Sequence, residues 1–125
     1  MLKWRLHRVR VADMKSSPRI SDDSIEKALH WLVEHAVEIG AAKERTVKAG
    51  HMLKHIEALE FKMSDAKSVD AKKSDARTSK RWLDAIREDA VAAGEYERLR
   101  ALREAAALKI EAWRSEQANM RAMKI

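Results

Sequence analysis

The sequence predicts an all-α fold, a long, coiled-coil-like antiparallel helical hairpin that dimerises into a bundle. Apolar residues recur every three or four positions over two long stretches, which is the period of one helix face. The chain has only three Gly and one Pro, so little interrupts long helices. A charged segment separates the two stretches. We therefore expect a basic N-terminal arm, residues 1–20, and one helical hairpin domain, residues 21–125.

The first long helix is predicted over residues 23–63. Residues 21–24 (Ser-Asp-Asp-Ser) supply capping side chains and the negative charge that suits the start of a helix. Asp23 and Glu26 have the spacing of a capping box. Apolar residues then follow in a coiled-coil rhythm: Ile25, Leu29, Leu32, Ala36 and Ile39. This stripe predicts a helix face that is buried against another helix.

The stripe weakens between Gly40 and Gly50, where the helix either continues or breaks. Small residues keep the helical phase through this stretch: Ala42, Thr46 and Ala49. Apolar residues resume at Met52 and continue to Met63. We therefore favour one uninterrupted helix, in which the small residues permit a bend or a close approach of another helix.

The connection, residues 64–79, contains three similar units that begin at Asp65, Asp70 and Asp75, each with the pattern Asp-Ala-Lys or Asp-Ala-Arg. A five-residue step moves around a helix instead of staying on one face, so this segment cannot bury a continuous stripe. We expect a charged turn of the hairpin, with room for a short helical turn inside it. A flexible loop that contacts an acidic partner is the alternative.

The second long helix is predicted over residues 80–122, with Thr78 or Ser79 as its N-cap. Its apolar stripe consists of Trp82, Ile86, Ala90, Ala93, Leu99, Leu102, Ala106, Ile110, Trp113 and Met120. Charged residues of both signs lie between them, and Arg100 and Glu104 are placed for an ion pair one turn apart. Such a helix is about 65 Å long. It must therefore lie along another long helix, from the same chain or from a second copy.

Large apolar residues on both stripes exceed what a two-helix hairpin covers, because each helix then has only one neighbour. We predict that the following residues form interfaces: Trp31, Leu32, Ile39, Ile56, Leu59, Trp82, Ile86, Leu99, Leu102, Ile110 and Trp113. The same residues also suit an intramolecular core, so both interpretations stay open. The expected assembly is a homodimer.

Residues 1–20 carry most of the net charge of +6, because they contain six Lys or Arg and one Asp. The residues suited to contact nucleic acid are Lys3, Trp4, Arg5, Arg8, Arg10, Lys15 and Arg19. Basic side chains bind phosphates and an aromatic ring stacks on a base, so we predict that this arm binds DNA. A mobile cationic tail and a short strand covering the helices are alternatives. If translation starts at Met14, the net charge falls to +3 and this argument loses force.

The composition argues against several classes of protein. The chain has no Cys, hence no disulfide and no thiolate metal site. His51 and His55 stand one turn apart, but no third ligand follows at a suitable spacing, so we expect no metal. No nucleophile motif and no acid in an apolar context is recognisable, so we expect neither an enzyme nor a cofactor. No apolar run is long enough to span a membrane, which predicts a cytoplasmic protein.

A resemblance is carried by residues 106–119 (AALKIEAWRSEQAN), by the Ser21-Asp22 helix start and by the charged connection. Over residues 20–122 the chain resembles small all-helical accessory proteins of tailed phages and prophages, whose function is unassigned. Such proteins accompany early phage genes for DNA replication and recombination. The resemblance therefore implies an accessory role in the interior of the infected host cell, and it transfers no functional residue.

The leading hypothesis is a non-enzymatic phage accessory protein that binds DNA or a DNA-processing complex through its arm and self-assembles through its helix stripes. A first alternative is an inhibitor of a host defence complex, similar to an anti-CRISPR protein, that acts by protein–protein binding. A second alternative is a structural coiled coil, such as a scaffold or a virion component. The expected partners are a second copy, DNA, and a host or phage protein complex.

Overall fold

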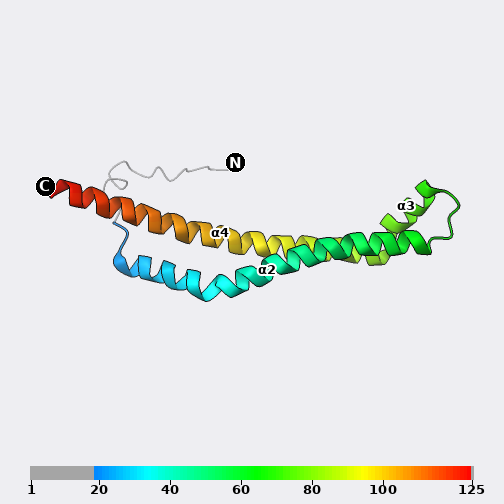
Figure 1. Cartoon of the computed structure of the whole chain (residues 1–125), viewed down its shortest axis with the longest axis horizontal. Coiled ribbons are helices and arrows are strands. Elements are labelled where there is room, and N and C mark those ends of the chain that lie inside the picture. Colours follow the sequence, from blue (N-terminus) through cyan, green and yellow to red (C-terminus); the bar gives the residue numbers. More distant parts are fainter. Residues whose placement is uncertain (1–18, 125) are drawn as a thin grey trace, which may run out of the picture.

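The computed structural model describes residues 19–124. This part of the chain contains three α-helices: α2 (Asp22–Met63), α3 (Val69–Thr78) and α4 (Lys80–Met123). The long helices α2 and α4 run antiparallel along each other as a helical hairpin, and α3 folds back at the turn (Figure 1). The predicted all-α hairpin is therefore confirmed, and both long helices have the predicted bounds to within one residue.

Helix α2 begins at a serine cap. Ser21 Oγ accepts a hydrogen bond of 3.1 Å from the backbone N–H of Ser24, and Asp22 and Asp23 follow in the first turn. These carboxylates suit the positive end of the helix dipole. The capping-box prediction is wrong, because Ser21 and not Asp23 occupies the N-cap position.

Helix α2 is continuous over 42 residues, including the stretch where a break was the alternative. Gly40 and Gly50 both lie in helical backbone, so the prediction of one uninterrupted helix is confirmed. The helix bends in its cyan segment, around residue 40, and its green part then lies close to α4 (Figure 1). A Cβ atom at Gly50 would lie 3.8 Å from Asp89 Oδ1, so the two long helices are close neighbours there.

The connection contains more helix than predicted, because α3 has ten residues. The Ser68 hydroxyl caps its start, and Arg77 Nε donates a hydrogen bond of 3.0 Å to Glu57 Oε1 of α2. Ala76, which belongs to one of the five-residue repeats, is fully buried. A helix of this length needs only a small buried residue and a few polar contacts to dock. The absence of a continuous apolar stripe therefore did not prevent a helix here.

Helices α2 and α4 meet along a seam, the set of inward positions that alternate by three and four residues. On α2 the seam residues are Ile25, Ala28, Leu32, His35, Ile39, Ala42, Thr46, Ala49, Leu53 and Ile56. On α4 they are Trp82, Ala85, Asp89, Ala92, Tyr96, Leu99, Ala106, Ile110, Trp113, Gln117 and Met120. Each of these residues is buried or half-buried.

The predicted stripes were partly wrong, because seven of their residues are exposed: Leu29, Ala36, Met52, Met63, Ala90, Ala93 and Leu102. On α2 the neighbouring residues Ala28 and His35 lie inward instead. Ala28 is 8% exposed and Leu29 beside it is 49% exposed, so the inward position decides burial here and the size of the side chain does not. Apolar residues occupy two adjacent faces of the helix, and their period alone does not show which face meets α4.

The seam buries few side chains. Among the described residues the buried apolar ones are Ile25, Ala28, Ile39, Ala42, Ala76, Ala85 and Leu99. Leu99 is the one large side chain in this part of the chain that is fully buried, and it packs with Ile39 and Ala42. Large apolar side chains stay exposed elsewhere: Leu29, Val33, Val37, Val47, Met52, Met63, Val69, Leu83, Val91, Leu102, Leu108 and Met123. A two-layer hairpin therefore leaves much of its apolar surface in water.

Candidate functional site

A groove lies between α2 and α4 in the half of the hairpin nearer to the turn. It has a volume of about 630 Å³. Its lining residues are Arg45, Lys48, Ala49, Met52, Ile56, Arg81, Asp84, Ala85, Glu88, Val91, Ala92 and Glu95. We name it the alanine groove. It is a candidate for protein–protein contact, because most of what it presents between the helices is apolar.

Small seam residues produce the alanine groove. Ala49, Ala85 and Ala92 each carry only a methyl group, so space remains between the helices that larger side chains would fill. Met52 and Val91 stand at its sides and are 45% and 71% exposed. An apolar side chain from a partner that entered between them would be removed from water together with them.

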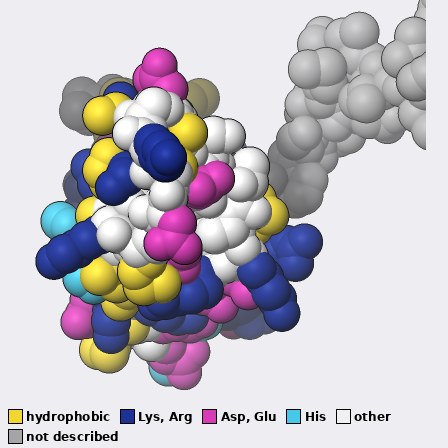
Figure 2. Space-filling view, turned by 90° about the vertical axis from the view of Figure 1, so that its right-hand side faces the viewer, with side chains coloured by type: hydrophobic (Ala, Val, Ile, Leu, Met, Phe, Trp, Pro, Cys, Tyr) yellow, Lys and Arg dark blue, Asp and Glu magenta, His cyan; other side chains and the backbone are white. Residues whose placement is uncertain are grey.

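The charged residues around the alanine groove are sorted by helix. The basic residues of α2 are Arg45 and Lys48, and the acidic residues of α4 are Asp84, Glu88 and Glu95. Arg81 of α4 is the exception, and its Nη1 lies 3.6 Å from Glu60 Oε1 of α2. Within residues 19–124, Arg45, Lys48 and Glu88 take part in no ion pair. Seen from the turn end, basic and acidic side chains alternate with hydrophobic ones (Figure 2).

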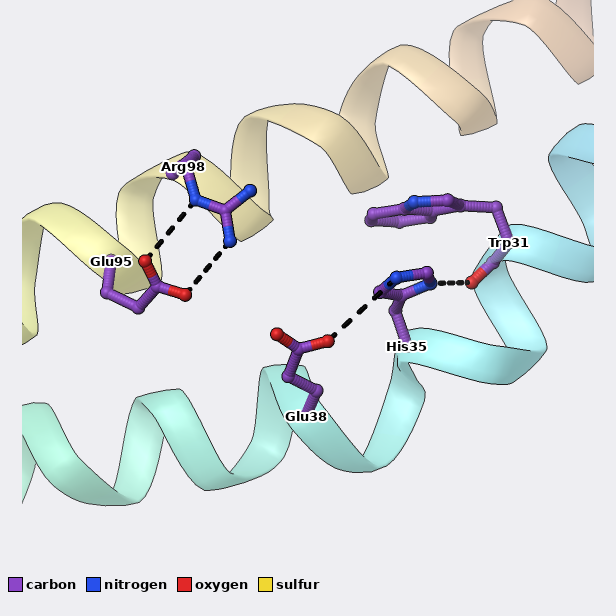
Figure 3. Close-up of polar contacts among 5 residues, drawn as sticks. All are labelled: Trp31, His35, Glu38, Glu95 and Arg98. Atoms are coloured by element: carbon purple, nitrogen blue, oxygen red, sulfur yellow. Dashed lines mark hydrogen bonds and ion pairs between the residues drawn. The ribbon is translucent and has the colours of Figure 1, made fainter.

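Glu95 is held at the edge of the alanine groove by Arg98, one turn further along α4 (Figure 3). Arg98 Nη2 donates to Glu95 Oε1 at 2.9 Å, and Arg98 Nε donates to Glu95 Oε2 at 3.3 Å. This hydrogen-bonded pair holds the pKa of the Glu95 carboxyl below its usual value and raises the pKa of Arg98. The Glu95 carboxyl therefore keeps its negative charge at neutral pH.

An aromatic pair lies between the helices nearer to the chain termini (Figure 3). The rings of Trp31 and His35 stack with their centroids 4.3 Å apart. His35 Nδ1 donates a hydrogen bond of 2.8 Å to the Trp31 carbonyl oxygen, and His35 Nε2 lies 3.9 Å from Glu38 Oε2. Trp31 also packs against the cluster around Leu99. The stack and the hydrogen bond explain how the seam accommodates a polar histidine.

A smaller pocket of about 450 Å³ lies near the end of α4 and is lined by Trp113, Arg114, Gln117 and Arg121. Trp113 Nε1 donates a hydrogen bond of 3.2 Å to Asp22 Oδ1, which joins the end of α4 to the start of α2. Arg19 Nη1 lies 3.3 Å from Met120 Sδ. We refer to this end as the open end, in contrast to the turn end where α3 lies. The segment before Arg19 is attached at the open end.

Six of the seven predicted nucleic-acid-binding residues lie outside the described residues: Lys3, Trp4, Arg5, Arg8, Arg10 and Lys15. The seventh, Arg19, is exposed and contacts Met120. The DNA-binding arm therefore stays a prediction from the sequence.

The predicted interface residues lie in different surroundings. Ile39 and Leu99 are buried inside the hairpin, whereas Leu102 is 42% exposed. The others are half-buried on or beside the seam: Trp31, Leu32, Ile56, Leu59, Trp82, Ile86, Ile110 and Trp113. Ile39 and Leu99 are therefore residues of an intramolecular core. The role of these residues in self-association stays a prediction.

The alanine groove was not predicted from the sequence, although a signal for it was present. Ala49, Ala85 and Ala92 occupy inward positions on the two helices. Recognising that they leave a groove requires the register, because one must know which residues of α2 face which residues of α4.

No group of three or more metal-ligating side chains could hold a metal ion among residues 19–124. None of the helices in this described range is long and apolar enough to cross a membrane. No protein family, curated protein or solved structure matches this chain. The resemblance to phage accessory proteins therefore stays a prediction that depends on the residues named above.

Proposed function

We propose that this chain is a non-enzymatic assembly protein whose hairpin pairs with a second copy and whose basic arm binds DNA or a DNA-processing complex. The observation that supports it best is the balance of apolar surface. The described residues bury seven apolar side chains and expose twelve large ones. Removing apolar surface from water contributes roughly 25 cal/mol per Å², so pairing two hairpins stabilises both. An accessory role in phage infection is the biological setting proposed from the resemblance.

The DNA-binding part of the proposal rests on the charge of residues 1–20, which hold six basic residues and one acidic residue. Each basic side chain that neutralises a phosphate releases condensed counterions, so affinity falls steeply as salt is added. The rest of the chain is nearly neutral, with a net charge of +1. Binding that depends on this arm therefore disappears when the arm is removed.

A binding titration at two salt concentrations tests the arm, with duplex DNA and two forms of the protein, residues 1–125 and 14–125. The shorter form lacks four basic residues: Lys3, Arg5, Arg8 and Arg10. We expect weaker binding and a salt slope that is smaller by up to about 3.6, at ~0.9 per phosphate contact. A full-length control with three exposed lysines of the hairpin replaced by Gln (Lys54, Lys67 and Lys73) has the same net charge as the shorter form. This control should keep most of the binding, and equal binding by residues 1–125 and 14–125 would refute the arm's role.

An inhibitor of a host defence complex is the second candidate. The observation that favours it is the alanine groove with its charged edges, because an apolar groove with a polar surround is a form that protein interfaces take. Recovery of a nuclease or effector from host lysate in a one-to-one ratio with the chain supports this candidate. Recovery must be lost when Val91 is replaced by Lys, since Val91 lines the groove and is exposed.

A further inference from the structure

At the turn end, α3 covers one side of the hairpin and the alanine groove lies on the other side. Arg77 Nε of α3 donates to Glu57 Oε1 at 3.0 Å, and Lys72 Nζ of α3 lies 5.7 Å from the centre of the Phe61 ring. Met52, on the groove, is five positions before Glu57 and therefore points about 140° away around α2. Helix α3 thus leaves the groove open.

The open side continues along the hairpin beyond the groove. Positions seven residues apart share one side of a coiled-coil helix. Beyond the groove these positions hold charged residues (Glu38 on α2, Arg98 and Lys109 on α4) and apolar ones (Trp31, Ala41 and Leu59 on α2, and Leu102, Ala105 and Ala112 on α4). This side is about 60 Å long and about 20 Å wide, the width of two helices. It exceeds the roughly 800 Å² per partner that a stable complex buries. The available area is therefore sufficient for a dimer.

The register of the hairpin fixes which groove residues lie at the same height. A Cβ atom at Gly50 would lie 3.8 Å from Asp89 Oδ1, so these two residues face each other across the seam. Because the helices are antiparallel, two residues back along α2 correspond to two residues forward along α4. Lys48 is therefore level with Val91.

Two symmetric arrangements place two alanine grooves face to face. With the twofold axis along the hairpin, both turn ends lie together and α2 of each copy lies on α4 of the other. With the axis across the hairpin, the copies point in opposite directions and α2 lies on α2. The first arrangement places the basic edge, Arg45 and Lys48, on the acidic edge, where Glu88 has no ion pair within the described residues and Glu95 is already paired with Arg98. The second places like charges together, which is unfavourable, so the charges select the first.

We propose that the alanine groove binds the alanine groove of a second copy about a twofold axis along the hairpin, which forms an antiparallel four-helix bundle with both turns at one end. This inference rests on the proposed self-association and adds its surface and its symmetry. Met52 and Val91 are removed from water in this bundle. The edge residues Arg45, Lys48 and Glu88, which have no ion pair within the described part of the hairpin, gain neighbours of opposite charge.

Single-cysteine variants test the arrangement, because the chain has no Cys of its own. Full chains with Lys48→Cys and Val91→Cys, carrying tags of different size, are mixed and oxidised. We expect a disulfide between the two different chains in a yield at least about tenfold above that of either chain alone, because only these positions come within disulfide reach. Val47→Cys is the matched control, since Val47 is exposed and points about 140° away from Met52. It should give only background yield with either partner.

The mass of the unmodified chain, measured by sedimentation over a range of concentrations, separates this inference from the proposed function. A dimer in which Lys48→Cys links mainly to itself has the other symmetry, and a dimer without either cross-link uses another face. Both results overturn the inference and leave self-association standing. A monomer at every concentration refutes self-association itself. The chain could also be a monomer whose groove is covered by its own N-terminal segment. In that case the cysteine of Val91→Cys reacts slowly with maleimide in residues 1–125 and fast in residues 14–125, and this result also overturns the inference.

Discussion

Replacement of Leu99 by Ala is predicted to lower the free energy of unfolding by about 3 kcal/mol. Leu99 is 1% exposed and is packed by Ile39 and Ala42, with Trp31 and Tyr96 around them. Its three outer carbon atoms are worth about 2.4 kcal/mol at ~0.8 kcal/mol each, and a cavity term is added. The cavity term is small here because a hairpin has only two layers and its helices can move together. The midpoint of thermal unfolding should fall by about 10 °C for a chain of this size.

The assay is urea and thermal unfolding followed by circular dichroism at one fixed protein concentration, since self-association makes stability depend on concentration. Leu108→Ala is the matched control, because Leu108 lies on the same helix and is exposed. We expect it to change stability by less than about 0.5 kcal/mol. If the two substitutions cost the same, Leu99 is not the centre of the hairpin core and the packing described above is incorrect.

Three further predictions concern local features. Ser21→Ala removes the cap of α2 and should cost about 1 kcal/mol in urea unfolding, and an unchanged midpoint would show that the cap contributes nothing. Gly94→Ala should raise the free energy of unfolding by about 0.8–1 kcal/mol, because no side chain lies within 4 Å of the new methyl group. A lower free energy of unfolding in this variant would contradict the prediction. Arg98→Gln should raise the pKa of Glu95 toward its ordinary value in an NMR titration, whereas Arg98→Lys should raise it less. Because the folded-state pKa is lowered, ionised Glu95 favours the hairpin above its unfolded-state pKa, and this contribution is lost as pH falls through the folded-state pKa. An unshifted pKa in the Arg98→Gln variant would refute the pairing.

The long helices could be predicted from the sequence because their signals are local. Ser21 and Ser79 precede the helical stretches, and the apolar period continues through Gly40 and Gly50. The predicted ion pair between Arg100 and Glu104 is present, with 3.2 Å between Arg100 Nε and Glu104 Oε1. Helix lengths, caps and pairs one turn apart all depend on residues within a few positions of each other.

The seam and the alanine groove could not be predicted in full, because they depend on residues far apart in the chain. On α2, Leu29 looked a better core residue than Ala28, yet Ala28 is buried and Leu29 is exposed. Which of these two neighbouring residues lies inward can be read only when the facing helix and its register are known. The same holds for α3, where Ala76 is buried because the turn brings it back against the hairpin.

The contact between Arg19 and Met120 places the attachment of the N-terminal segment at the open end, away from the turn. In the proposed bundle both turns share one end, so the two N-terminal segments are anchored next to each other at the opposite end. Attachment of one segment to a nucleic acid would then raise the local concentration of the other, and avidity gains of about 10²–10⁴ are typical of such tethering. Apparent DNA affinity would therefore rise sharply across the protein concentrations at which the chains pair.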